Sequence, residues 1–352
     1  MAKTLKVLLK FAVPVAILGF LFWNMDPEKL QQVWQQDKNY PLLIAALIVA
    51  LAAFGFSFFR WCILVRCQGI QLSVLEAFRL GAIGFLFSFV SPGSVGGDLF
   101  KAVFLARRAR GKTTECFASV FVDRGIGMFG LLLLVATVLL VSRPTGSTPE
   151  HAIEMARVVN TTLIMIGIGT VLFGILMLGG RWVDDLIESV AKRAYVGPIL
   201  GKIGRSIRLY HRFRMAMLGS VLLSMLVQAL LAVSIYFIAI SLYDSPPSLL
   251  EHLVIVPVGM LGSALPISPN GLGVFEAIIQ HMYELIPGRQ TAASGVIIAF
   301  VFEVVKVVMA LIGAIFYWTG KQDMRQVISE AEQMAGELDE EGDGEGDEPS
   351  KS

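Results

Sequence analysis

The sequence has few charged residues, which account for 16% of its 352 positions, whereas soluble domains average about 25%. Its mean hydropathy is +0.69, and several windows long enough to cross a bilayer hold few or no charged side chains. Such windows are the signal of membrane-spanning helices. The scarcity of charge therefore excludes an ordinary soluble domain and predicts an all-α polytopic membrane protein.

Residues that carry metal-based or nucleophilic chemistry are equally scarce. The three cysteines lack metal-ligand spacing, and the four histidines form no cluster along the chain. Gly111-Lys112-Thr113 resembles the end of a phosphate-binding loop, but Ala106 stands where that loop needs a glycine. We therefore expect no metal, no cofactor, no nucleic-acid partner and no enzymatic activity, so any transport would be passive or ion-coupled.

Apolar segments follow one another over residues 1–320, which we expect to form one integral membrane domain. Lysines before the first segment place the N-terminus in the cytoplasm by the positive-inside rule, and we expect the C-terminus there too. Residues 321–352 form an acidic tail whose composition favours disorder. About six full transmembrane helices are expected, at residues 11–23, 41–65, 115–141, 158–180, 215–240 and 291–318.

Residues 181–214, between two of these segments, are markedly basic. Ile199, Ile203 and Ile207 recur there at helical spacing, with lysine and arginine residues offset from them. This pattern is typical of an amphipathic helix lying on an anionic membrane surface. We expect an interfacial helix on the cytoplasmic side.

Two breaks rich in proline and glycine interrupt the apolar sequence. They read Ser91-Pro92-Gly93-Ser94-Val95-Gly96-Gly97-Asp98 and Ser268-Pro269-Asn270-Gly271-Leu272-Gly273-Val274-Phe275-Glu276. Each break separates two apolar arms, and irregular backbone at membrane depth is tolerated only where it is buried in protein or lines a cavity. We expect two broken re-entrant helical hairpins, the first entering from the cytoplasm and the second from outside.

The two breaks belong to a longer internal repeat. They are offset by 268 − 91 = 177 residues, and residues 41–141 and 215–318 both read as span, broken hairpin, span. Because the first repeat begins outside and the second begins inside, the two halves are predicted to be inverted. Inverted repeats with paired helix breaks are typical of transporters.

The breaks are the first candidates for a binding site. The N-terminus of a half-helix inside a membrane presents free N–H groups and a positive dipole end, which suit an anion such as a phosphodiester, and glycines allow close approach of the backbone. The alternative is a tight structural bend packed against the other repeat. Our candidate residues for binding a lipid headgroup are Ser91, Gly93, Gly96, Gly97, Asp98, Asp123, Arg124, Ser268, Asn270, Gly271, Gly273, Glu276, Glu303 and Lys306.

Two carboxylates directly follow the breaks. Asp98 and Glu276 would either stabilise the start of a helix or contact a cationic headgroup. Within the first hairpin, Glu76 and Arg79 are three residues apart and can pair on one helix face. Arg60, near the inner end of its span, is explained by snorkelling towards the membrane surface.

Charged residues inside the spans usually face the protein interior. Asp123 and Arg124 are adjacent, so their side chains point to different faces of one helix, and each is expected to pair across helices. A role in substrate binding or gating and a purely structural role both stay open for them. Glu303 and Lys306 are three apart, and a structural salt bridge is the expected interpretation for this pair.

Both breaks, the basic run Lys101–Arg110 and Val122-Asp123-Arg124 resemble the lysylphosphatidylglycerol synthase transmembrane region, or flippase-like domain family, over roughly residues 5–320. The resemblance implies a flippase for a phospholipid. Proteins that name the family also carry a soluble synthetase domain that uses aminoacyl-tRNA. No stretch after Trp318 is long enough for such a domain, so lysyl transfer is not expected here.

Three functions are left by these observations. The first is a lipid transporter that moves an anionic or aminoacylated phospholipid, or another lipid-linked headgroup, between leaflets of the cytoplasmic membrane. The second is a membrane scaffold or partner subunit of a lipid- or glycan-modifying enzyme, which would dock on residues 181–214 and the acidic tail. The third is a membrane enzyme that uses Asp123, Arg124 and Glu303 for acid–base chemistry, and no nucleophile or metal constellation supports it.

Overall fold

Every element in the described part of the chain is helical. The computed structural model describes residues 23, 31, 38–90, 96–109, 111–142, 149–178, 210, 212–264, 268–285 and 293–319. No strand occurs in these ranges, so the predicted all-α class is confirmed. The elements are α3 (Tyr40–Cys67), α4 (Val74–Val90), α5 (Gly96–Arg108), α6 (Thr113–Ser142), α7 (Pro149–Leu178), α10 (Arg214–Leu242), α11 (Leu249–Ser263), the 3₁₀ turn η1 (Pro269–Gly271), α12 (Val274–Leu285) and α13 (Gly295–Thr319).

Four helices, α3, α6, α10 and α13, are long and apolar enough to cross a membrane, which makes this a polytopic membrane protein. Helix α7 begins at Pro149, before the start of the span expected at 158–180. Proline at the first helical position is already set to a helical φ. Residues 11–22 of the expected first span, most of the basic segment 181–214 and the tail 321–352 lie outside the described residues.

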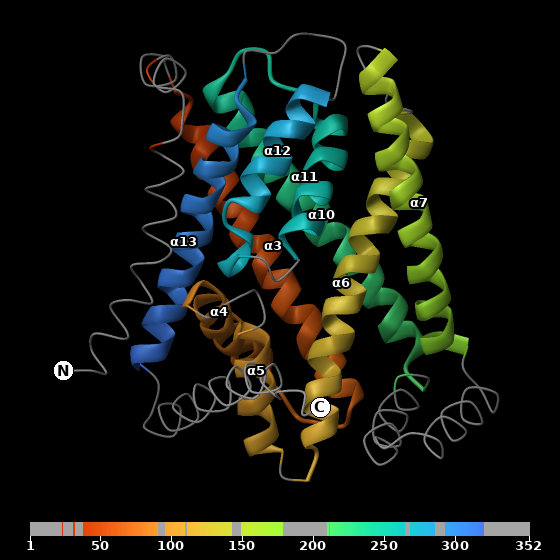
Figure 1. Cartoon of the computed structure of the whole chain (residues 1–352). Coiled ribbons are helices and arrows are strands. Elements are labelled where there is room, and N and C mark those ends of the chain that lie inside the picture. The colour runs from red at the N-terminus through yellow and green to blue at the C-terminus, as the bar shows by residue number, and fades with distance from the viewer. Residues whose placement is uncertain are drawn as a thin grey trace, which may run out of the picture.

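Each half of the described chain contains two short helices between two long ones. Figure 1 shows α4 and α5 at the lower end of the bundle, and α11 and α12 in its upper half, with α3, α6 and α10 running between the two pairs. This placement agrees with inverted repeats. The inversion itself, and the re-entry of the two hairpins into the membrane, remain predictions.

Helices α3 and α10 pack against each other through a shared core. Ala46, Ala50 and Ala53 are fully buried on α3, at the spacing of one helix face, within the same core as residues of α10. The Ser234 hydroxyl of α10 donates a hydrogen bond to the Ala46 carbonyl at 2.8 Å. Lipid tails are as apolar as leucine, so helices associate in membranes through small residues and interhelical hydrogen bonds of this kind.

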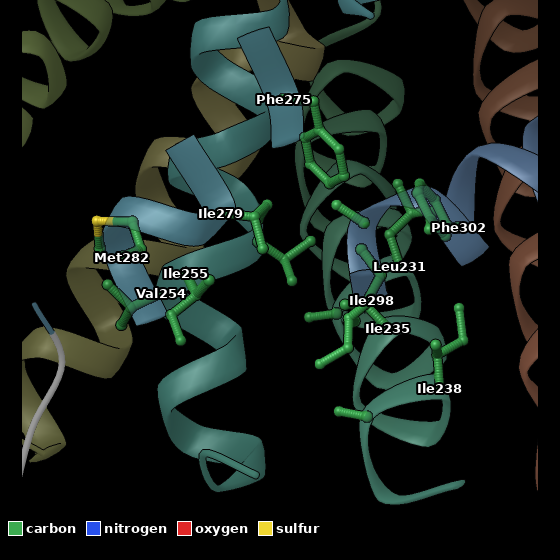
Figure 2. Packing of buried hydrophobic residues seen from close by; sticks show 14 of the residues in the cluster. Leu231, Ile235, Ile238, Val254, Ile255, Phe275, Ile279, Met282, Ile298 and Phe302 are labelled. Carbon is green, nitrogen blue, oxygen red and sulfur yellow. The ribbon is translucent and has the colours of Figure 1, made fainter. Parts of the chain in front are cut away.

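The largest apolar core joins α10 to the second hairpin and α13. Figure 2 shows side chains from all four helices converging. They include Ile235 of α10, Ile255 of α11, Ile279 of α12 and Phe302 of α13, each of which is fully buried. The second hairpin, α11 and α12, is therefore packed against both α10 and α13.

A buried histidine ties the two arms of this hairpin together. His252 of α11 has Nδ1 2.9 Å from the Ser248 carbonyl and Nε2 2.7 Å from the Tyr283 hydroxyl of α12. A carbonyl only accepts, so Nδ1 carries the proton and Nε2 accepts from Tyr283. The sequence indicated no histidine cluster, and His252 is explained by this contact.

The second break has a backbone that glycine and asparagine favour. Asn270, Gly271 and Gly273 have φ values of 52°, 74° and 86°, in the left-handed region that most side chains avoid. A Cβ atom at Gly271 would also lie 2.4 Å from the Ser263 side chain. The backbone of the bend therefore favours glycine at both Gly271 and Gly273.

The first hairpin is clamped by an ion pair that local spacing did not predict. Glu76 of α4 pairs with Arg108 at the end of α5, while the Arg79 guanidinium lies 5.7 Å from the Phe316 ring centre of α13. The expected Glu76–Arg79 pair was wrong, since the return of α5 brings a closer cation to the carboxylate.

Gly313 marks where α13 packs against α4. A Cβ atom at this position would lie 2.1 Å from the Ala82 carbonyl oxygen. We expect Gly313→Ala to separate the two helices and lower the thermal unfolding midpoint of the detergent-purified protein. Gly219→Ala is the matched control, because a Cβ atom at Gly219 would meet nothing within 4 Å, and it should be neutral or gain up to about 1 kcal/mol. Equal midpoints for the two variants would contradict this packing.

Candidate functional site

A central cavity of about 320 Å³ lies between the two hairpins. Its lining comes from α3, α4, α5, α6, α10, α11, the second break and α13, so residues far apart in sequence meet there. Six charged side chains reach it, namely Arg60, Asp98, Lys101, Asp123, Arg124 and Lys306.

Some of the candidate residues line the cavity and others do not. Ser91 and Gly93 lie outside the described residues. Gly96 begins α5 without lining the cavity, and Ser268, Gly271, Gly273 and Glu276 stay within the second break and the first turn of α12. The candidates that line the cavity are Gly97, Asp98, Asp123, Arg124, Asn270 and Lys306.

Asp123 of α6 belongs to a buried network that joins three helices. Its Oδ1 atom accepts from Arg60 Nε of α3 at 2.8 Å. Arg60 Nη1 also donates to the Ser224 hydroxyl of α10 at 2.9 Å, and that hydroxyl donates to the Gly127 carbonyl at 3.1 Å. The expectation that Asp123 pairs across helices is confirmed, and this network fixes one wall of the cavity.

Arg60 was misread from the sequence as a snorkelling residue. It is 5% exposed, and its partner Asp123 lies 63 residues further along the chain. A charge within a strongly apolar span usually faces the protein interior and pairs with a charge of another span. This rule, applied to Arg60, would have predicted a partner across helices.

Asp98 lies between two cations at the start of α5. Its carboxylate is 2.7 Å from Lys101 Nζ and 3.5 Å from Arg124 Nη1 of α6. Both cations are partly accessible, with 14% of the Lys101 side chain and 32% of the Arg124 side chain exposed. Asp98 therefore positions these two cations at the cavity, and the second pairing expected across helices is confirmed.

Lys306 of α13 connects the cavity to the second break. Its Nζ atom lies 2.5 Å from Glu303 Oε1, which confirms the pair predicted on one helix face. The same atom donates to the Asn270 carbonyl at 3.5 Å and lies 5.4 Å from the centre of the Phe275 ring. The ammonium group thus holds the irregular backbone of the break against α13.

Glu276 has a local partner at the start of α12. Its Oε2 atom accepts from the Gly273 N–H at 2.6 Å. A carboxylate in the first turn satisfies free N–H groups and complements the helix dipole. This contact supports the interpretation of Glu276 as a residue that stabilises the helix start.

The charges of the lining favour an anion. Four basic side chains and two acidic ones reach the cavity, so the residues that line it carry a formal charge of 4 − 2 = +2. One of the four cations, Lys306, is paired with Glu303, which lies outside the lining. The N-terminal turn of α5, with Gly97 in the lining, adds the positive end of a helix dipole. Gly97 has no room for a side chain, because a Cβ atom would lie 2.1 Å from the Gly84 carbonyl oxygen of α4. In the described part of the chain, no group of three or more His, Cys, Asp or Glu residues could hold a metal ion.

Residues 7–314 match the lysylphosphatidylglycerol synthase TM region family, and the chain belongs to this family. The prediction made from the two breaks and Val122-Asp123-Arg124 is confirmed. A relative is a UPF0104 membrane protein of Methanothermobacter thermautotrophicus, which is 21% identical over 285 residues covering 77% of this chain and 83% of the relative. No solved structure matches the chain.

Proposed function

We propose that this protein moves a lipid with an anionic, phosphate-bearing headgroup between the leaflets of the cytoplasmic membrane. The observation that carries the proposal is the central cavity with its formal charge of 4 − 2 = +2, inside a bundle of apolar helices. Charged side chains inside a membrane protein are costly and usually mark a substrate or ion pathway. Membership of a family of membrane proteins supports the proposal.

The arrangement of the lining suggests how such a lipid would be held. Lys101 and Arg124 are partly exposed and oriented by Asp98, so they would form charge-assisted hydrogen bonds with the phosphate. Phe54, Phe85 and Met128 contribute apolar surface to the same cavity. The headgroup would lie on the polar part of the lining while the acyl chains remain in contact with apolar side chains and lipid.

Movement across the membrane would require the cavity to open alternately to each side. The two hairpins form opposite parts of its wall, and the long helices pack around them. Rocking of one repeat against the other around a fixed site is the usual mode of transporters built from inverted repeats. In this proposal both chain termini lie in the cytoplasm.

The test is a lipid-movement assay with the purified full-length chain in vesicles. The vesicles carry a trace of phosphatidylglycerol labelled with nitrobenzoxadiazole, and dithionite added outside destroys the label in the outer leaflet. We expect label from the inner leaflet to move to the outer leaflet, and so to be destroyed, faster than in protein-free vesicles and faster than for equally labelled zwitterionic phosphatidylcholine. Rates equal to those of protein-free vesicles would refute the proposal, and a co-purifying second protein in that case would favour the scaffold alternative.

A further inference from the structure

A buried charge cluster lies behind the cavity at the second break. It consists of Glu276 of α12 with Glu303 and Lys306 of α13, which are 1%, 0% and 6% exposed. The two carboxylates interact electrostatically, and Lys306 pairs with Glu303. With all three groups ionised, the cluster carries a formal charge of 1 − 2 = −1, and its two carboxylates are almost fully buried.

The two carboxylates also have unsatisfied oxygen atoms. Glu276 Oε1 and Glu303 Oε2 are buried without a hydrogen-bond partner among the described residues. An ionised carboxylate in an apolar environment costs several kcal/mol unless it is paired and hydrogen-bonded, and binding a proton removes that cost. One proton would bring the cluster to zero formal charge.

The proton is expected on Glu303. Glu276 lies in the first turn of α12, where the Gly273 N–H and the positive end of the helix favour an ionised carboxylate. Glu303 lies in the middle of α13, where backbone N–H groups are used within the helix. Its ion-pair partner is Lys306.

We propose that Glu303 is a proton-binding site and that its protonation is coupled through Lys306 to anion binding in the cavity. Lys306 lines the cavity and contacts Glu303 at the same time. An ionised Glu303 holds the ammonium group, whereas a protonated Glu303 leaves it available to an anion. The headgroup and Glu303 thus compete for Lys306, and binding of the anion is accompanied by uptake of a proton.

Other charged groups near α13 are already engaged. On α4, Glu76 pairs with Arg108, and Arg79 lies over the Phe316 ring of α13. On α3, Arg60 pairs with Asp123. On α12, the Tyr283 hydroxyl contacts His252. Within the described ranges, Glu276 and Lys306 are therefore the charged groups that act on Glu303.

The coupling is testable through the pH dependence of lipid binding, and this step rests on the proposed function. Binding of nitrobenzoxadiazole-labelled phosphatidylglycerol to the detergent-purified protein is titrated from alkaline to acid pH. We expect affinity to rise as pH falls, by at most about tenfold per pH unit for one linked proton. Glu303→Gln should bind with a pH-independent affinity near the acid value of the wild type.

Glu284→Gln is the matched control, because Glu284 is an exposed carboxylate on α12. This variant should keep the pH dependence of the wild type. If Glu303→Gln keeps the wild-type dependence as well, the coupling proposal is overturned.

A second readout needs no lipid probe. Infrared spectra of the protein purified in a detergent without ester groups should show the C=O stretch of a protonated carboxyl at a pH where exposed carboxylates are ionised, in the wild type and Glu284→Gln but not in Glu303→Gln. If this band is present while labelled lipid neither binds nor moves, the proton site stands and the lipid function fails. If the band is absent while lipid moves, the lipid function stands and the proton site fails.

Discussion

Replacing Arg124 with alanine is expected to slow the movement of labelled phosphatidylglycerol in vesicles by about 10- to 100-fold, because a hydrogen bond to a charged group is worth about 1.5–3 kcal/mol. The guanidinium group is partly exposed at the cavity and oriented by Asp98. Asp98→Ala should reduce the rate as well, since Lys101 and Arg124 lose the carboxylate that positions them. The dithionite assay measures both rates.

The control for this experiment is Arg107→Ala. Arg107 is an exposed cation in the last turn of α5 and does not line the cavity. It should move lipid at the wild-type rate, and all variants should elute as the wild type does in size-exclusion chromatography. If both Asp98→Ala and Arg124→Ala move lipid at the wild-type rate, neither residue belongs to the lipid-binding site.

Asp123→Ala is expected to lower the free energy of unfolding by about 3–5 kcal/mol, because it leaves a buried guanidinium group without its counter-charge. Arg60 would keep Ser224 as a partner but lose the carboxylate 2.8 Å away. The loss can be measured by equilibrium unfolding of the protein in mixed micelles. The double variant Arg60→Met with Asp123→Leu should be less destabilised than Asp123→Ala, since no unpaired charge remains.

An exposed ion pair provides the comparison for this effect. Arg108→Ala removes the partner of Glu76 at a side chain that is 51% exposed, and pairs of this kind contribute about 1 kcal/mol or less. Asp123→Ala should therefore be several times more destabilising than Arg108→Ala. Similar losses for the two would show that the buried network does not hold α3, α6 and α10 together.

Much of the candidate site could be inferred before the fold was known, because charges in apolar spans are few. Asp123 and Arg124 were expected to pair across helices, and both do so. Their partners were not predicted, since Arg60 and Asp98 lie far from them along the chain. Local spacing succeeded for Glu303 and Lys306 on one helix and failed for Glu76, whose partner Arg108 lies on α5.

The sequence by itself determined the class of protein, the long apolar spans, the two breaks and the family. These features depend on hydropathy over a window and on residues that are neighbours in the chain, and both can be read directly. The tertiary structure decided which charges meet, where the cavity lies and how Lys306 connects it to Glu303. Those contacts arise when helices distant in sequence pack together, and the packing depends on side-chain shape along whole helix faces, which one sequence does not display.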